Sequence, residues 1–230
     1  NSMSVPACAD TATYYAAALP LGGEDLRAAL HTIIAGHTVV SYGDAWSALE
    51  ALDEAANASS RVRLIYSDFT HAKTDRGTTT GWNREHIWPR SFGVGDKGPD
   101  YSDLHALHPA DANVNSARNN RIFSACGGCE APAHAEAAAD TAKDVTRFLP
   151  SAAERGDVAR ALFYMATRRW RAVRDAASYT VGHMACLIRL ASANHIPGLR
   201  PARPARVVSA KFSPGAKRRP AQTSSSETPP

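Results

Sequence analysis

The segment at residues 81–91, GWNREHIWPRS, constrains this chain more than any other part of its sequence. It places Glu85 and His86 side by side between two tryptophans, with Pro89 shortly after them. We expect a strand here that ends near Pro89, because proline cannot donate to the hydrogen-bond ladder of a sheet. Neighbouring residues on a regular strand point to opposite faces. Glu85 and His86 can therefore serve one site only where the strand kinks or ends.

A second segment, DLHALHPADANVNSARNN at residues 103–120, gathers further ionisable and amide side chains. The two segments together predict a strand that supplies a base and a following helix that supplies a metal ligand. Mg²⁺ prefers oxygen ligands and keeps several waters, so Glu85 and one asparagine of the second segment suffice to bind it. His86 is then free to act as a general base, because an imidazole with its ordinary pKa of roughly 6.5 accepts a proton near neutral pH.

The remaining pattern predicts a chain of mixed helices and strands. Apolar residues recur at helical spacing in three segments, and alternation predicts one more strand. Gly93, Gly95, Gly98 and Pro99 predict a loop that follows the strand of the first segment. We expect helices at 24–35 (Leu26, Leu30, Ile33 and Ile34 inward), 45–55 (capped by Asp44; Trp46, Leu49 and Leu52 inward), 110–120 and 154–170 (Val158, Leu162 and Met165 on one side, Arg160 and Arg168 on another), and a strand at 62–67 (Val62, Leu64 and Tyr66 on one face).

Composition divides the chain into a body and a tail. Seven of the fourteen prolines lie at residues 197–230, in a segment with little apolar surface, and we expect this tail to be disordered. From residue 200 onward there are seven of the 26 basic and one of the 22 acidic residues, which leaves 19 basic and 21 acidic residues in the body. The net charge of +4 therefore comes from the tail and gives weak support for a polyanionic partner. No run approaches about 18 apolar residues, so we expect no membrane span.

The four cysteines favour disulfide bonding over zinc binding. Cys126 and Cys129 form a C-x-x-C pair, but there is no second such pair, and Cys8 and Cys186 are remote in sequence. An even number of cysteines is typical of an exported protein with disulfides. We expect Cys126 and Cys129 to be oxidised, either to each other or to remote partners.

The motifs in their order resemble a known family. WNREHIWPRS, DLHALHPAD and VNSARNN, with LHTIIAGHTVVSY before them and RGDVARALFYM after them, are similar to the bacterial endonuclease I family of ββα-metal (His-Me finger) nucleases. The similarity runs from about residue 14 to 169, and the C-terminal part does not match the family pattern. It implies an α+β fold, a mixed helical domain with a small β-sheet that carries the ββα-metal motif. We assign residues 12–196 to this nuclease domain and residues 197–230 to the basic tail.

The resemblance also implies roles for particular residues. His86 would be the general base, Glu85 and Asn115 the ligands of one Mg²⁺, with Mn²⁺ or Ca²⁺ as substitutes, and Arg118 a phosphate contact. The family hydrolyses DNA, and often RNA, with little sequence preference. We therefore expect a Mg²⁺-dependent endonuclease that acts as a monomer on nucleic acid and is secreted, periplasmic or extracellular.

Alternatives stay open from the residues alone. Three neighbouring asparagines compete with Asn115 for the ligand role or for helix capping: Asn113, Asn119 and Asn120. Asp103, His105 and His108 could form a zinc site of a different hydrolase, although Pro109 argues against a helix there; otherwise Asp103 and His105 would brace the active-site strand. A degenerate domain that binds polyanions through its tail is a third reading. Trp82 and Trp88 are expected in the core.

Overall fold

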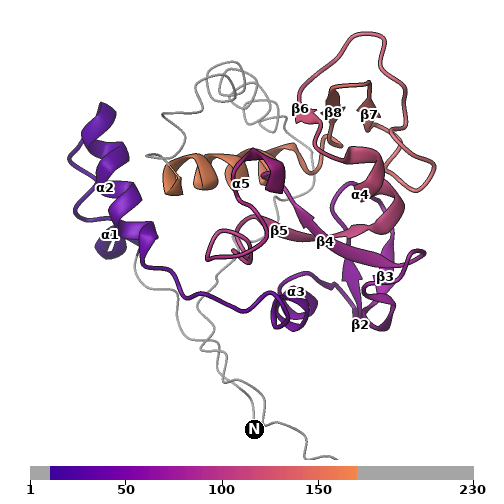
Figure 1. Ribbon diagram of the computed structural model, residues 1–230, viewed down its shortest axis with the longest axis horizontal. Helices are drawn as coiled ribbons and strands as arrows, with labels where there is room; N and C mark the ends of the chain where they lie inside the picture. The colour runs from indigo at the N-terminus through magenta and orange to yellow at the C-terminus, as the bar shows by residue number, and fades with distance from the viewer. Residues whose placement is uncertain (1–10, 170–230) are drawn as a thin grey trace, which may run out of the picture.

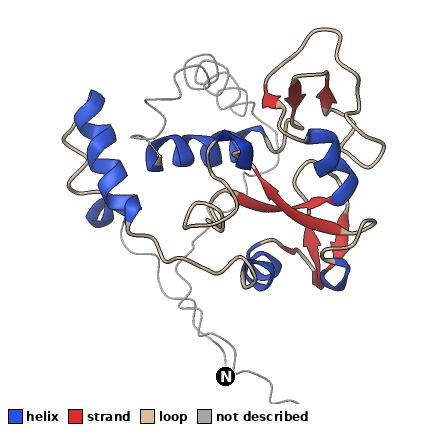
Figure 2. Ribbon diagram, in the orientation of Figure 1, coloured by secondary structure: helices blue, strands red, loops and turns tan. Residues whose placement is uncertain are grey.

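The structure is a computed structural model that describes residues 11–169. Figures 1 and 2 show a mixture of helices and short strands, which confirms the expected α+β class. The helices are α1 (Thr11–Tyr14), α2 (Gly23–Ala35), α3 (Ala45–Leu52), α4 (Ala112–Arg118) and α5 (Arg155–Arg168), with short 3-10 turns η1 (Lys73–Asp75) and η2 (Arg90–Phe92). The strands are β1 (Glu54–Ala55), β2 (Ala58–Arg63), β3 (Thr70–Ala72), β4 (Trp82–His86), β5 (Leu107–Asp111), β6 (Ile122–Phe123), β7 (Ala142–Lys143) and β8 (Arg147–Leu149).

The strands of the described residues form three small sheets rather than one. Their orders are β1-β2-β3, β4-β5 and β6-β8-β7. The central pair, β4 and β5, is antiparallel and places Glu85 opposite His108. Pro109 lies within β5, so the second segment is extended before α4, as its proline indicated. The chain thus passes from one strand through a loop to a second strand and directly into a helix.

The strand expected at residues 62–67 is observed earlier in the chain, as β2, and overlaps the predicted range only at residues 62 and 63. β2 ends at Arg63, and Ile65 instead makes an isolated bridge to Ala110 next to β5. Tyr66 then has a φ of 76°, which turns the chain away from an extended path. The side chains of Val62, Leu64 and Tyr66 are buried as expected, but Ile65 is buried too, because it joins the neighbouring sheet.

Two clusters of buried apolar side chains hold these elements together. The larger lies between α5 and the strands β5, β6 and β8, and the smaller lies beneath α3 against β2, β4 and β5. Trp82, which is fully buried, belongs to the smaller cluster, and Trp88 belongs to the larger one. Both tryptophans are core residues, as predicted.

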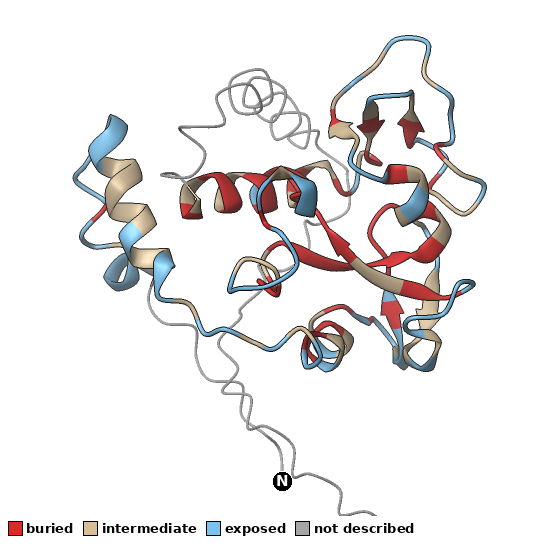
Figure 3. Ribbon diagram, viewed as in Figure 1, coloured by how far each residue is buried: buried red, intermediate tan, exposed pale blue. Residues whose placement is uncertain are grey.

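The helices differ in how well they are buried. On α5 the predicted apolar side is buried, and Figure 3 shows this helix in red along its inner side. Arg160 on α5 is exposed, as expected, whereas Arg168 is buried against acidic partners. The apolar face predicted for α2 is only half-buried in the described structure, because α2 stands beside α5 at one end of the molecule (Figure 1).

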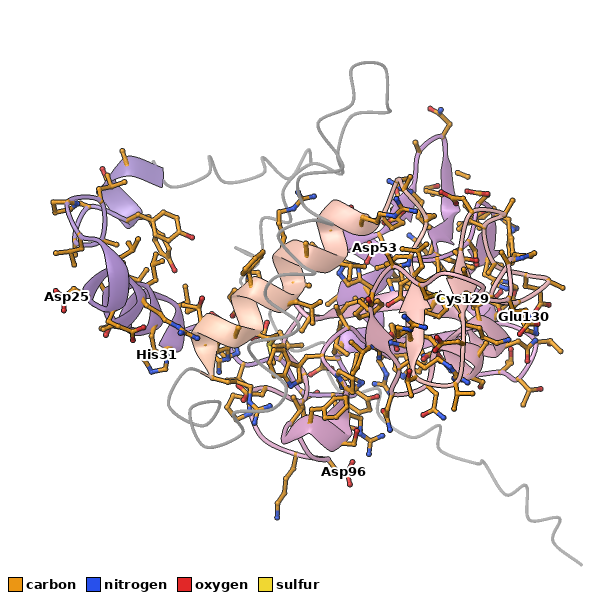
Figure 4. All side chains as sticks on the ribbon, turned by 90° about the horizontal axis from the view of Figure 1, so that it is seen from above. Asp25, His31, Asp53, Asp96, Cys129 and Glu130 are labelled. Carbon is orange, nitrogen blue, oxygen red and sulfur yellow. A yellow bond between two sulfur atoms is a disulfide. The ribbon has the colours of Figure 1, made fainter. Side chains whose placement is uncertain are left out.

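The cysteine prediction is confirmed for one pair. Cys126 and Cys129 form a disulfide with each other. Cys129 and Glu130 lie at the end of the molecule opposite to Asp25 and His31 (Figure 4). Cys8, Cys186 and the predicted tail at residues 197–230 lie outside the described residues. No described helix has the length and apolarity that crossing a membrane requires.

Candidate active site

A pocket of about 860 Å³ lies beside β4 and the start of the loop that follows it. Its wall includes all four residues predicted for the site, Glu85, His86, Asn115 and Arg118. β4 supplies the first two and α4 supplies the others. The order strand, strand, helix therefore brings the two predicted segments to one place.

Glu85 and His86 are neighbours on β4, yet both reach the same pocket, because the pocket lies along an edge of this strand. Four consecutive residues, 83–86, line the same pocket, although alternate side chains leave a strand on opposite faces. Because β5 covers one edge of β4, we infer that the pocket lies along the other edge, where side chains from both faces reach it. Asn83 and Glu85 thus approach from one face, and Arg84 and His86 from the other.

Glu85 is a buried carboxylate with two polar partners on one oxygen. Its Oε1 accepts a hydrogen bond from Tyr66 Oη at 3.0 Å and forms an ion pair with Arg118, whose Nη1 lies 3.1 Å away. Burial raises the pKa of Glu85, and the cation of Arg118 and the Tyr66 hydroxyl oppose this rise. Burial therefore makes the charged form of Glu85 unfavourable, and a bound cation would stabilise that charged form.

His86 is held by its Nε2 atom. Nε2 lies 2.9 Å from the backbone carbonyl oxygen of Tyr101, and the imidazole ring stacks on the Tyr101 ring at 5.2 Å. A carbonyl can only accept, so the proton sits on Nε2 and the lone pair of Nδ1 is available. Burial lowers the pKa of His86 to about 4, helped by nearby arginines. The imidazole is therefore neutral, and able to accept a proton, throughout the neutral pH range.

Asn115 completes the same wall as Glu85. Its Nδ2 donates to Asn83 Oδ1, which directs its own Oδ1 away from Asn83 and leaves it as an acceptor. Asp111 holds the start of α4, because its Oδ1 accepts from the backbone N–H groups of Asn113 and Val114 at 2.8 and 3.0 Å. Asn113 donates to Glu136 and does not line the pocket, whereas Asn119 and Asn120, at the end of α4, line it as Asn115 does. Among the four asparagines, the hydrogen bond to Asn83 distinguishes Asn115.

Arg118, for which we expected a phosphate contact, lines the pocket and is held there by several protein groups. Arg118 is 1% exposed, and its guanidinium donates to the carbonyls of His86 at 3.0 Å and Ile87 at 2.8 Å, besides its contact with Glu85. The guanidinium carbon lies 4.4 Å from the ring centroid of Phe123. Arg118 therefore supports the end of β4 from within through Nη1 and Nη2, while its buried Nε has no hydrogen-bond partner among the described residues.

The zinc alternative is not supported by the described residues. Among residues 11–169, the one group of three potential ligands whose atoms come together is Cys126, Cys129 and Asp144, and its two sulfurs form the disulfide. Asp103, His105 and His108 do not form such a group, because His108 lies on β5 opposite Glu85.

Asp103 does brace the structure, but not through the strand that we expected. Its Oδ1 accepts from His105, and its Oδ2 accepts from Tyr164 of α5 at 2.8 Å. Arg168 Nε lies 3.3 Å from the same Oδ2 and donates to Asp100 at 2.9 Å. The acids of the loop are thus tied to α5. Since Asp100 directly precedes Tyr101, this tie also fixes the carbonyl that holds His86.

Sequence reasoning missed the aromatic residues that complete the site. Tyr66 donates to Glu85, Tyr101 holds His86, and Tyr42 lies 4.0 Å from the Tyr101 ring. All three come from segments that carry no ionisable motif. These tyrosines lie 15 to 44 positions away in sequence from the β4 residues that they contact, so no local sequence pattern could predict the contacts.

Two antiparallel strands followed by a helix thus bring a buried carboxylate, an oriented histidine and an amide to one pocket, and the carboxylate and amide oxygens are ligands of the kind that a hard cation takes. The chain belongs to the Endonuclease I family, whose sequence model matches residues 22–186. The match continues past residue 169, so the C-terminal divergence expected from the motifs begins later than predicted.

Two relatives are similar over most of this chain. It is 42% identical over 170 residues to the "Extracellular ribonuclease" of Bacillus amyloliquefaciens and 43% identical over 173 residues to the "Extracellular ribonuclease" of Bacillus subtilis (strain 168). Each similarity covers 73% of this chain. The chain spans 57% and 58% of the length of these relatives, less than two thirds of either.

Proposed function

We propose that this domain is a metal-dependent nuclease that hydrolyses phosphodiester bonds with little sequence preference. Family membership and the names of the two relatives support nucleic acid as the substrate. Those names favour RNA, and the family resemblance adds DNA. They also support an exported protein, in which a Cys126–Cys129 disulfide is stable.

His86 is the general base in this proposal, and its orientation is the observation that carries it. The bond from Nε2 to the Tyr101 carbonyl fixes the tautomer whose Nδ1 accepts the proton of an attacking water. The pKa of about 4 keeps the base unprotonated before substrate binds. An anionic phosphate beside the ring would stabilise the imidazolium that forms, and so would raise this pKa toward the range in which proton transfer is efficient.

Glu85 and Asn115 are the proposed ligands of one Mg²⁺, with Mn²⁺ or Ca²⁺ as substitutes. The donors fit: a carboxylate and an amide oxygen are hard ligands, and burial leaves Glu85 short of positive charge despite Arg118. A bound Mg²⁺ would supply charge stabilisation on the phosphoryl oxygens and on the leaving oxygen. The hydrogen bond from Asn115 to Asn83 orients the amide, and Tyr66 and Arg118 orient the carboxylate.

The ββα-metal motif of the family corresponds, in this proposal, to β4, β5 and α4. Arg118 becomes a positioning residue instead of a phosphate contact. It links Glu85 to the backbone of His86 and Ile87, so it keeps the carboxylate and the histidine in a constant relation. We expect the domain to act as a monomer.

Degradation of plasmid DNA and of a structured RNA, each with Mg²⁺ and with EDTA, tests the proposal. We expect cleavage of one or both with Mg²⁺, none with EDTA, and a rate that falls roughly 10²–10⁴-fold in His86→Ala. A degenerate domain that only binds polyanions would cleave neither substrate and would lose its affinity when residues 200–230 are removed. Cleavage that persists in EDTA would contradict the metal-dependent mechanism.

A further inference from the structure

Arg84 forms a cationic feature on the pocket wall that the proposed chemistry does not use. Its guanidinium carbon lies 3.4 Å from the ring centroid of Tyr42 and 4.1 Å from that of Trp46. All three residues line the pocket. Stacking on aromatic rings uses the faces of a guanidinium and leaves its N–H groups, which lie in its plane, as hydrogen-bond donors. The rings therefore hold the cation in a fixed orientation without neutralising it.

The charge of Arg84 has no acidic partner within residues 11–169. Nη1 donates to the backbone carbonyl of Tyr42, and the buried Nε has no hydrogen-bond partner there. The other arginines of the pocket wall differ, because Arg90 pairs with Asp96 and Arg118 pairs with Glu85. A cation in this condition would be stabilised by an anion that enters the pocket.

The position of Arg84 indicates which anion this is. Arg84 and His86 leave β4 on the same face, two residues or about 6.6 Å apart along the strand, and Glu85 lies between them on the other face. A phosphate that is attacked by water at His86, beside a cation that Glu85 would hold, is therefore displaced from Arg84. An anion at Arg84 is the neighbour of the reacting group, and a nucleic-acid strand carries such a neighbouring phosphate on every nucleotide.

We propose that Arg84, stacked on Tyr42 and Trp46, binds the backbone phosphate next to the scissile one. This inference rests on the proposed nuclease function and defines its substrate as a strand with at least two phosphodiesters. Arg84 presents in-plane donors to the phosphate oxygens, which is the geometry that favours arginine over lysine at phosphates. The contact would add affinity and salt dependence without reading the sequence of bases.

Short substrates of defined charge test the proposal with the active protein and Mg²⁺. A dinucleoside monophosphate has a scissile phosphate and no neighbour. A trinucleotide has two phosphodiesters, and replacing either one with a neutral methylphosphonate leaves one cleavable bond beside an uncharged link. The wild type should cleave the fully charged trinucleotide with a kcat/KM roughly tenfold above that of at least one methylphosphonate form.

The variant Arg84→Met keeps the long side chain and removes the charge. It should cleave the charged and neutral trinucleotides alike, and its loss of kcat/KM should be much larger on the charged trinucleotide than on the dinucleoside monophosphate. On long RNA or DNA, the slope of log KM against log salt should fall by about 1. Arg160→Ala, which removes an exposed arginine of α5 outside the pocket, is the control and should leave every value unchanged. Arg84→Gln replaces the methionine variant should that variant not fold.

The outcomes separate this inference from the function on which it rests. A wild type that cleaves none of these substrates, and neither long DNA nor RNA, contradicts the nuclease function itself. A wild type that cleaves the charged and both neutral trinucleotides equally well contradicts the neighbouring-phosphate contact alone, and this comparison needs no variant. An equal loss on all substrates in Arg84→Met would show that Arg84 builds the catalytic site instead of a separate subsite.

Discussion

At the scale of single residues, the same arginine holds both Glu85 and His86 in position. Arg118 reaches from α4 to the carboxylate of Glu85 and to the carbonyls of His86 and Ile87. The tyrosines 66 and 101 hold the two functional groups from other parts of the chain. The proposed metal ligand and the proposed base, which are adjacent in sequence, are therefore held at a fixed distance from each other.

Replacement of Arg118 tests whether it positions the site or binds substrate. Arg118→Met should lower the free energy of unfolding by about 3–5 kcal/mol, because it leaves Glu85 buried without its cation. Arg118→Lys should recover little of this loss, since an ammonium cannot bridge three acceptors in the plane of a guanidinium. Urea unfolding of the three proteins measures the effect. Unchanged stability together with weaker substrate binding would restore the phosphate role that the sequence suggested.

At the scale of elements, Asp111 and Asp103 hold α4 and the loop after β4 in place. Asp111 ends β5 and caps α4, and its Oδ2 accepts from His71 of β3 at 3.1 Å. Asp103 joins the loop to α5. Both lie outside the pocket wall, so they act on the site through the backbone.

Loss of the Asp111 cap should loosen α4 and with it Asn115. Asp111→Ala should cost about 1–2 kcal/mol of unfolding free energy and should raise the Mg²⁺ concentration needed for half-maximal cleavage. Asp111→Asn, which can still cap, is the matched control and should lie near the wild type. Equal Mg²⁺ dependence in all three proteins would show that α4 does not need its cap to place the ligand.

Asp103 predicts a loss of stability in acid. Burial raises the pKa of this carboxyl, but hydrogen bonds from His105 and Tyr164 outweigh burial and hold the pKa below the ordinary 3.8. A depressed pKa in the folded state stabilises the protein above the unfolded pKa, and this stability disappears as the pH falls through the folded value. His37 Nε2 lies 3.7 Å from Oδ2 of this carboxylate, and Arg168 Nε lies 3.3 Å from the same atom.

The variant Asp103→Asn isolates this effect. It should be less stable than the wild type by about 1.5–3 kcal/mol near neutral pH, where it lacks the charge that accepts these hydrogen bonds. This difference in unfolding free energy between the two proteins should become smaller as the pH falls below about 4. Urea midpoints of both proteins between about pH 6 and pH 3 measure it. A gap that stays constant down to pH 3 would mean that the charge of Asp103 contributes nothing.

At the scale of the whole molecule, local patterns predicted the elements that carry the site and missed the contacts that orient it. The strand ending before Pro89, the helix around Asn115 and the apolar side of α5 each follow from spacing within one segment. The place of Ile65 beside β5 and the burial of Arg118 do not, because both depend on partners far away in sequence. Arginine is usually exposed, and the phosphate contact expected of Arg118 came from the family resemblance and not from a local pattern.

The central claim is that Glu85 binds the metal ion while the adjacent His86 acts as the base. Measuring the cleavage rate as a function of Mg²⁺ concentration tests this claim most directly. His86→Ala should stay slow at every Mg²⁺ concentration, because it lacks the base while Glu85 and Asn115 still bind the ion. Glu85→Ala and Asn115→Ala should both recover activity as Mg²⁺ rises, because each lacks one ligand. If added Mg²⁺ instead rescues His86→Ala and not Glu85→Ala, the two roles are reversed, and if all three variants cleave at the wild-type rate, the catalytic site lies elsewhere.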